Sequence, residues 1–211
     1  MGTQKNAKQK VNMKKLLIAT NNKGKVKELQ ELLQGLEAEL VTPADIHLTL
    51  DVEEDGRDYA ENAAKKAIAF ARASGLISLA DDSGLEVDAL DGAPGLYSAR
   101  YHPKPGATDA DRRAYMRENL QGKPQPWTAR FHATIAIAIP EGELHVVEGN
   151  CHGEIIPEER GSNGFGYDPI FYIPEMNQTM AELDMEQKNR LSHRGLAAMK
   201  AIPVLKRLFG G

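Results

Sequence analysis

The stretch Lys15-Leu16-Leu17-Ile18-Ala19-Thr20-Asn21-Asn22-Lys23-Gly24-Lys25 passes from a short apolar run into a polar turn. Beyond it, Leu29, Leu32 and Leu33 recur with helical spacing. This order predicts a buried strand, a turn and a helix. The turn brings amide donors and two lysines to a helix N-terminus, which favours an anion.

This turn lacks the spacing of a P-loop. Only Gly24 precedes Lys25, and Val26 follows where a Ser or Thr is needed. For this segment alone, a capped surface turn is the better interpretation. Its value as an anion site depends on which other segments converge on it.

A second helix is predicted after Asp58, which can cap its start. Small residues recur on one stripe from Ala60 to Ala71, and Gly75 ends the pattern. The run 77–80 then reads as a buried strand that leads into Asp81-Asp82-Ser83-Gly84. We therefore expect the two acids at the end of a strand. The alternative is that residues 81–84 form only a turn.

The second half of the chain mixes strands and helices. Thr108 and Asp111 have capping-box spacing, which predicts a helix to Leu120. Apolar and other residues alternate over 131–139, the clearest strand pattern, and a turn at 140–142 pairs it with 144–151. The mixed order predicts an α/β or α+β sheet flanked by helices.

The C-terminal third contains a glycine-rich loop and one long helix. Residues 160–169 hold too many glycines for regular structure, and a short apolar strand follows. Asp184 and Gln187 can cap a last helix that runs toward Leu208. Pro203 is expected to kink or end this helix, because proline lacks an amide donor.

Composition limits the kinds of protein that this chain can be. It has 211 residues, 41% of them hydrophobic, a single Cys and a formal charge of −4. Five lysines lie in the first 15 residues, so the remainder carries −9, which disfavours binding to nucleic acid. No apolar stretch is long enough for a membrane span. We expect a cytoplasmic protein without membrane partners, with residues 1–12 as a disordered extension and 13–211 as one domain.

Two acidic clusters are candidates for metal and proton chemistry. Glu53 and Glu54 lie in one predicted loop, and Asp81 and Asp82 follow a buried strand. Carboxylates from two segments can hold Mg²⁺ together with substrate phosphates, and one of them can act as a base toward water. Taken singly, a solvated loop and an ordinary turn are the better interpretations.

Two further groups offer contacts for a nucleotide. Phe165-Gly166-Tyr167-Asp168 provides aromatic faces for a base and an acceptor for a ring N–H. Lys188, His193 and Arg194 provide donors to a phosphate or a keto oxygen. The alternatives are aromatic side chains that close the edge of the core and a solvated helix face.

Together these segments resemble the inosine and xanthosine triphosphate pyrophosphatase family, over about residues 14–198. The motifs that carry the resemblance are Ala19-Thr20-Asn21-Asn22-Lys23-Gly24-Lys25, Glu61-Asn62-Ala63, residues 80–90 with Asp81-Asp82-Ser83-Gly84, residues 92–101, residues 161–171 with Phe165-Gly166-Tyr167-Asp168, and residues 188–195.

The resemblance implies an enzyme with a long mixed sheet and a substrate cleft between two lobes. It implies Mg²⁺-dependent hydrolysis of nonstandard purine nucleoside triphosphates to the monophosphate and pyrophosphate. It also implies a homodimer. Asn21 departs from the family, where many members have Gly, but Asn tolerates a positive φ.

The same resemblance suggests roles for individual residues. Asp82 is the expected base or metal ligand, with Asp81 and Lys25 as further catalytic candidates and Glu53 or Glu54 as the second metal ligand. The expected substrate contacts are Thr20, Asn21, Asn22, Lys23, Gly24, Lys25, Lys66, Ser83, Phe165, Gly166, Tyr167, Asp168, Lys188, His193 and Arg194.

Two other functions stay open at this point. The same scaffold could act on pyrimidine or otherwise modified triphosphates. A non-catalytic nucleotide-binding regulator is the second possibility, but we would expect it to lack the paired acids. Donors from His193 or Arg194 would favour a purine with a keto oxygen at C6 over adenine.

Overall fold

Seven strands form one mixed sheet in the computed structural model, which describes residues 14–210. The strand order is β2-β1-β3-β4-β5-β6-β7. β1 is parallel to β2 and β3, and the later neighbours are antiparallel. The strands are β1 (Lys15–Ile18), β2 (Glu39–Val41), β3 (Ile77–Val87), β4 (Trp127–Ala138), β5 (Leu144–Ile155), β6 (Phe171–Ile173) and β7 (Gln178–Thr179). The predicted mixed fold is confirmed.

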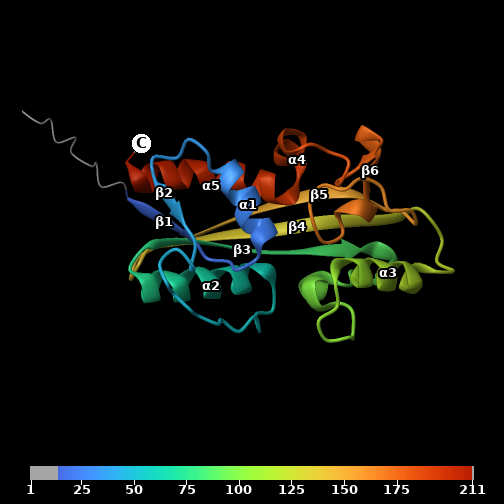
Figure 1. Ribbon diagram of the computed structural model, residues 1–211, viewed down its shortest axis with the longest axis horizontal. Helices are drawn as coiled ribbons and strands as arrows, with labels where there is room; N and C mark the ends of the chain where they lie inside the picture. Colours follow the sequence, from blue (N-terminus) through green and yellow to red (C-terminus); the bar gives the residue numbers. More distant parts are fainter. Residues whose placement is uncertain (1–13, 211) are drawn as a thin grey trace, which may run out of the picture.

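Helices cover both faces of the sheet, with α1, α4 and α5 on one side and α2 and α3 on the other (Figure 1). The α-helices are α1 (Lys23–Leu32), α2 (Tyr59–Ser74), α3 (Asp109–Leu120), α4 (Met185–Leu191) and α5 (His193–Phe209). The 3-10 helices are η1 (Asp88–Leu90), η2 (Gly95–Arg100), η3 (Asp168–Ile170) and η4 (Pro174–Met176). The extension expected over residues 1–12 lies outside the described residues.

The predicted start and end signals of α2 and α3 are present. The Asp58 side chain accepts a hydrogen bond from the amide of Glu61 at 2.8 Å, and Gly75 ends α2 with a φ of 68°. Thr108 and Asp111 form the predicted capping box of α3. These local bonds satisfy backbone groups that a helix end leaves unpaired, so each helix begins where the sequence indicates.

The acidic pair does not lie at a strand end as expected. β3 runs without a break through residues 81–84, because β4 pairs with it from Ser78 to Val87. The backbone hydrogen bonds of this long antiparallel ladder keep residues 81–84 in a strand, although Asp and Gly have a low propensity for strands. Asp81 and Asp82 therefore occupy the middle of the sheet, where successive side chains point to opposite faces.

The last predicted helix is divided in two, and proline does not end it. Ser192 leaves helical geometry between α4 and α5, and its hydroxyl accepts from the amide of Gly195. α5 then continues through Pro203 to Phe209. Pro203 is exposed, whereas Leu205 and Phe209 are buried in the core. Packing beyond the proline holds the helix together despite one lost hydrogen bond.

Apolar packing divides the molecule into two lobes. In the first lobe, β1, β2, α1, α2 and α5 pack around the β1 end of the sheet. In the second lobe, α3, β6 and the far halves of β3, β4 and β5 share a separate core. None of the helices within residues 14–210 has both the length and the apolar composition to cross a membrane.

Candidate active site

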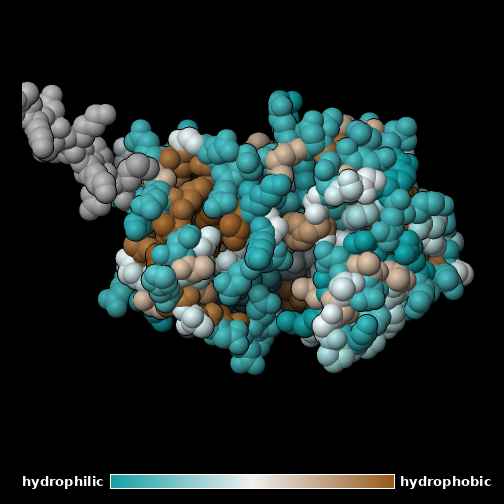
Figure 2. Space-filling view, viewed as in Figure 1, coloured by the Kyte–Doolittle hydropathy of each residue, from teal (hydrophilic) through white to brown (hydrophobic). Residues whose placement is uncertain are grey.

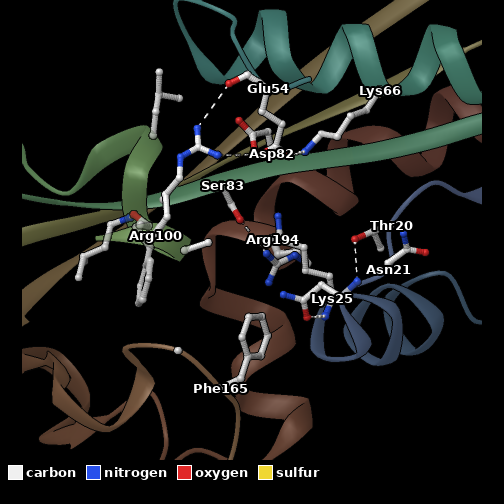
Figure 3. Close-up of a pocket in the computed structure, with 18 of the residues that line it drawn as sticks. Thr20, Asn21, Lys25, Glu54, Lys66, Asp82, Ser83, Arg100, Phe165 and Arg194 are labelled. Carbon is white, nitrogen blue, oxygen red and sulfur yellow. Dashed lines mark hydrogen bonds and ion pairs between the residues drawn. The ribbon is translucent and has the colours of Figure 1, made fainter. Parts of the chain in front are cut away.

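A cavity of about 330 Å³ lies between the two lobes. The surface view shows a hollow at this position (Figure 2). Fifteen of the residues singled out in the sequence line it, and they come from both lobes: Thr20, Asn21, Asn22, Lys25, Glu54, Lys66, Asp82, Ser83, Phe165, Gly166, Tyr167, Asp168, Lys188, His193 and Arg194. Lys23, Gly24, Glu53 and Asp81 are absent from its lining. Segments far apart in the chain thus meet in one crevice (Figure 3).

The first turn presents side chains to the cavity and caps its own helix. The Asn22 side chain is the N-cap of α1 and accepts from the amides of Gly24 and Lys25 at 2.9 and 3.2 Å. The Thr20 hydroxyl accepts from the amide of Asn22. Three of the amides expected to meet an anion are therefore already bonded. The Lys25 ammonium remains the main cation of this turn in the cavity.

Gly24 packs against an aromatic ring and does not line the cavity. A Cβ atom at Gly24 would lie 2.6 Å from Cδ1 of Phe165, so the aromatic ring packs directly on the glycine backbone. Only glycine leaves this space free. The contact joins α1 of the first lobe to the glycine-rich loop of the second lobe.

Asp81 lies behind the cavity wall, where it pairs with two cations. Its carboxylate is 2.5 Å from the Lys25 ammonium and 3.1 Å from Nε of Arg194, and it is fully buried. Burial raises the pKa of Asp81, but the charges of Arg194 and Lys25 outweigh burial and hold this pKa well below its usual range. Asp81 therefore stays ionised and is a poor proton acceptor, which argues against the catalytic role expected for it.

Asp82 points to the other face of the sheet, toward the cavity and α2. Its Oδ1 atom lies 3.2 Å from the ammonium of Lys66. Burial raises the pKa of Asp82, and the carboxylates of Glu54 and Asp81 raise it further against the opposing charges of Lys66 and Lys25. A carboxylate with a raised pKa in a crevice is suited to accept a proton from water.

A chain of alternating buried charges runs along the α1 side of the cavity. Glu28 of α1 accepts from Arg194 at 2.5 Å and from Lys188 at 2.6 Å, and Lys188 also contacts Asp168 at 2.6 Å. We call the whole series the ion-pair chain; its members in order are Lys25, Asp81, Arg194, Glu28, Lys188 and Asp168. Every buried charge in it has an opposite neighbour, which offsets the cost of removing it from water.

Glu28 was not among the residues singled out in the sequence. It follows Lys25 by three positions and so lies on the same side of α1. An acid next to the apolar position Leu29 was the available signal. That signal is weak, because an acid on a helix is usually solvated.

The cavity also contains two carboxylates suited to a divalent ion. The Lys66 ammonium lies 2.8 Å from Oε1 of Glu54 and 3.2 Å from Oδ1 of Asp82, so both carboxylates converge on one point of positive charge. Their oxygens are the ligands that Mg²⁺ prefers. Glu54 lines the cavity and Glu53 does not, which favours Glu54 as the ligand. Within residues 14–210, no three His, Cys, Asp or Glu side chains gather as a metal cluster.

Aromatic and imidazole groups also line the cavity. The Phe165 ring lies 5.4 Å from the Lys188 ammonium and 5.7 Å from the Arg194 guanidinium. His193 stacks on Phe131, with ring centroids 4.7 Å apart, and its Nδ1 atom is buried without a hydrogen-bond partner among residues 14–210. Burial, helped by the charge of Arg194, holds the pKa of His193 well below 6.5, so the ring is neutral at pH 7.

The loop that carries Phe165 is held from several sides. The amide of Phe165 donates to Oδ2 of Asp168 at 2.9 Å, and the amide of Gly166 donates to Asp109 of α3 at 2.8 Å. The Tyr167 hydroxyl donates to the carbonyl of Ser98 in η2 at 2.9 Å. The glycine-rich segment is therefore a fixed wall of the cavity, in which Tyr167 serves as an anchor within the core of the second lobe.

Comparisons with known proteins agree with this geometry. A sequence model of the Ham1 family matches residues 16–204. A protein of Desulforamulus reducens called dITP/XTP pyrophosphatase is 54% identical, with 92% of this chain and 97% of that protein covered. A protein of the same name from Thermus thermophilus is 47% identical, with 91% and 92% covered. The solved structure of a HAM1 protein from Coxiella burnetii superposes with a TM-score of 0.83 at 42% identity, with 92% of this chain and all of that one covered.

Proposed function

The chain belongs to the Ham1 family, and from that premise we propose that it hydrolyses nonstandard purine nucleoside triphosphates to a monophosphate and pyrophosphate. The proposed substrates are ITP, dITP and XTP. One observation carries the proposal: a single cavity is lined both by charged groups, among them Lys25, Lys66 and Asp82, and by Phe165 with a neutral His193. A triphosphate and a purine need those two kinds of surface at once.

Asp82 is the proposed base. Its carboxylate would take a proton from the attacking water, while the water oxygen bonds to the α-phosphorus and the bond from that phosphorus to the bridging oxygen breaks. The electron pair leaves with pyrophosphate. The low pKa of Asp81 leaves Asp82 as the better proton acceptor of the pair.

Cations in the cavity would hold the triphosphate. Lys25 and Lys66 both line the cavity, and both lie close to the Asp81 and Asp82 segment of β3. Positive charge at this place would stabilise the leaving pyrophosphate. Thr20, Asn21 and Asn22 would add hydrogen bonds from the turn before α1.

The residues present suit Mg²⁺ as the cofactor. Glu54 and Asp82 would hold it, with substrate phosphates completing its shell. When bound, the ion would neutralise phosphate charge and polarise the phosphoryl oxygens. One or two carboxylates completed by substrate phosphates are typical of Mg²⁺ sites in proteins.

The polarity of the base-binding side favours a keto purine. Lys188, His193 and Arg194 are the donors expected to reach the C6 oxygen. Adenine has an amino group at that position, so donors would face donors, at a cost of about 1–3 kcal/mol for each unpaired buried group. A homodimer, which the family resemblance implies, and a cytoplasmic location, which the composition of the sequence suggests, belong to the same proposal.

The deciding experiment measures pyrophosphate release. ITP, XTP, ATP, GTP, CTP and UTP are compared at limiting concentration, with and without Mg²⁺. We expect ITP and XTP to be favoured by kcat/KM and the reaction to need the metal. Equal rates on pyrimidine triphosphates would overturn the substrate assignment, and nucleotide binding without any release would indicate a regulator.

A further inference from the structure

Arg100 was not assigned any role in the sequence, yet it lies on the rim of the same cavity. It ends η2, which belongs to the second lobe. Ser98 of η2 accepts from the amide of Leu85 through its hydroxyl at 2.8 Å and from Tyr167 through its carbonyl. The backbone that carries Arg100 is therefore fixed to the core of the second lobe.

Glu54 reaches Arg100 from the other side of the cleft. It lies in the loop before α2, and Leu50 and Val52 of that loop pack against the core of the first lobe. The Nη1 atom of Arg100 is 3.7 Å from Oε2 of Glu54, and Nη2 donates to the main-chain oxygen of Glu54 at 3.4 Å. Figure 3 shows the arginine reaching toward Glu54. The contact therefore connects the lobes across the cavity mouth.

The two cations that bind Glu54 use different oxygen atoms. Lys66 contacts Oε1 and also bonds to Asp82, whereas Arg100 contacts Oε2 and the main-chain oxygen. A divalent ion between Glu54 and Asp82 would compete with the Lys66 ammonium for the same two carboxylates. Arg100 contacts the other oxygen, so its grip does not conflict with the ion.

We propose that Arg100 is a positioning residue that holds Glu54 across the cleft, with Oε1 turned toward Asp82 for the divalent ion. The assignment rests on the proposed function, because it takes Glu54 and Asp82 as the metal ligands. Arg100 is half exposed and Glu54 is 36% exposed, so the pair is a moderate contact that orients the carboxylate. Loss of this contact is expected to weaken metal affinity and to make the loop of residues 51–56 less ordered.

The first test uses protein without nucleotide. Hydrogen exchange of residues 51–56 and Mn²⁺ binding, measured by electron paramagnetic resonance, are compared for wild type, Arg100→Ala and Arg100→Lys. Mn²⁺ shares the preference of Mg²⁺ for oxygen ligands. Arg100→Ala should speed exchange in this loop and weaken Mn²⁺ about two- to fivefold, and Arg100→Lys should restore part of the affinity. Unchanged Mn²⁺ affinity in Arg100→Ala would overturn the proposal.

The second test separates metal affinity from turnover. In Arg100→Ala the Mg²⁺ concentration for half-maximal rate should rise about two- to fivefold, whereas kcat at saturating Mg²⁺ should stay near the wild-type value. In a Glu54→Gln background, Arg100→Ala should add no further change. Additive effects would contradict an action through Glu54.

Arg57→Ala is the matched control. It removes another arginine close to the same loop, and Arg57 pairs with Glu61 without contacting Glu54. It should leave all these measurements unchanged. If no triphosphate is hydrolysed by wild type, the proposed function fails, but loop exchange and Mn²⁺ binding still decide the role of Arg100.

Discussion

Asp81 and Asp82 follow one another in β3, and their carboxylates face opposite sides of the sheet, the first toward Lys25 and Arg194 and the second toward Lys66. Alternation along the strand thus gives adjacent acids of the same type two different surroundings. One is fixed as an anion within the ion-pair chain. The other faces the cavity with a raised pKa.

Replacement of Asp82 by asparagine should abolish most catalysis while the fold survives. Loss of a general base lowers rates by about 10²- to 10⁴-fold. Because the folded environment of Asp82 disfavours its charge, the variant should melt at the same temperature as wild type or higher. Pyrophosphate release and thermal unfolding are measured together, and Asp55→Asn, at an exposed acid paired with Lys65, is the control. Wild-type turnover would remove Asp82 from the mechanism.

Asp81→Asn, in contrast, should reduce the stability of the fold. The change leaves the buried charges of Lys25 and Arg194 without one partner, and breaking a buried pair costs about 3–5 kcal/mol. Urea unfolding should show this loss, with Asp82→Asn as the neighbouring comparison. A variant of full stability would show that the ion-pair chain contributes little to folding.

The pH dependence should follow from the raised pKa of Asp82. Activity needs the ionised carboxylate, so kcat should fall with decreasing pH as Asp82 becomes protonated, and this fall should occur at a lower pH in the metal-loaded enzyme than in the metal-free protein, because a bound cation favours the carboxylate. Stability should move the other way. The folded state binds this proton more tightly than the unfolded state, so the Asp82 contribution favours folding below the folded pKa and is lost as pH rises through it. The melting-temperature difference between Asp82→Asn and wild type should therefore grow with pH.

Glu54 and Glu53 provide a matched pair for testing the metal site. Glu54→Gln should raise the Mg²⁺ concentration for half-maximal rate by at least about tenfold, because a proposed ligand is lost. Glu53→Gln removes the same charge one residue away and should change it little, since Glu53 is exposed outside the cavity. The reverse ranking would exchange the roles of the two residues.

Gly24→Ala should weaken recognition of the base and spare the phosphate contacts. The new methyl group would meet the Phe165 ring and push it away from its position. Base stacking on an aromatic side chain is worth about 1–3 kcal/mol. The KM for ITP should therefore rise by a factor that corresponds to at most this loss of binding energy. Competitive inhibition by inorganic triphosphate should be unchanged. Weakened inhibition would instead support a phosphate role for Gly24.

The fold could be predicted where local signals act alone. Asp58, Gly75 and the Thr108 capping box determine helix ends through bonds within a few residues, and the structure contains them all. The course of β3 through Asp81 and Asp82 could not be predicted in this way. It depends on pairing with β4 and on cations that come from α1, α2 and α5.

Prediction of the site had the same limit. Motif residues such as Lys66 and Phe165 were found, and the structure brings them to one cavity. Glu28 and Arg100 were missed, because a single acid on a helix or a single arginine after a turn has no pattern of its own. Their surroundings come from partners 166 and 46 residues away in the chain. Only the tertiary structure reveals such neighbours.

The ion-pair chain has a consequence for biosynthesis. Its members are spread from Lys25 in the first helix to Arg194 in the last. A nascent polypeptide that has not yet emerged from the ribosome beyond α4 lacks the guanidinium that bridges Asp81 and Glu28. Hydrolysis of triphosphates should therefore begin only after translation has delivered the final helix, so truncated products should be inert toward the nucleotide pool.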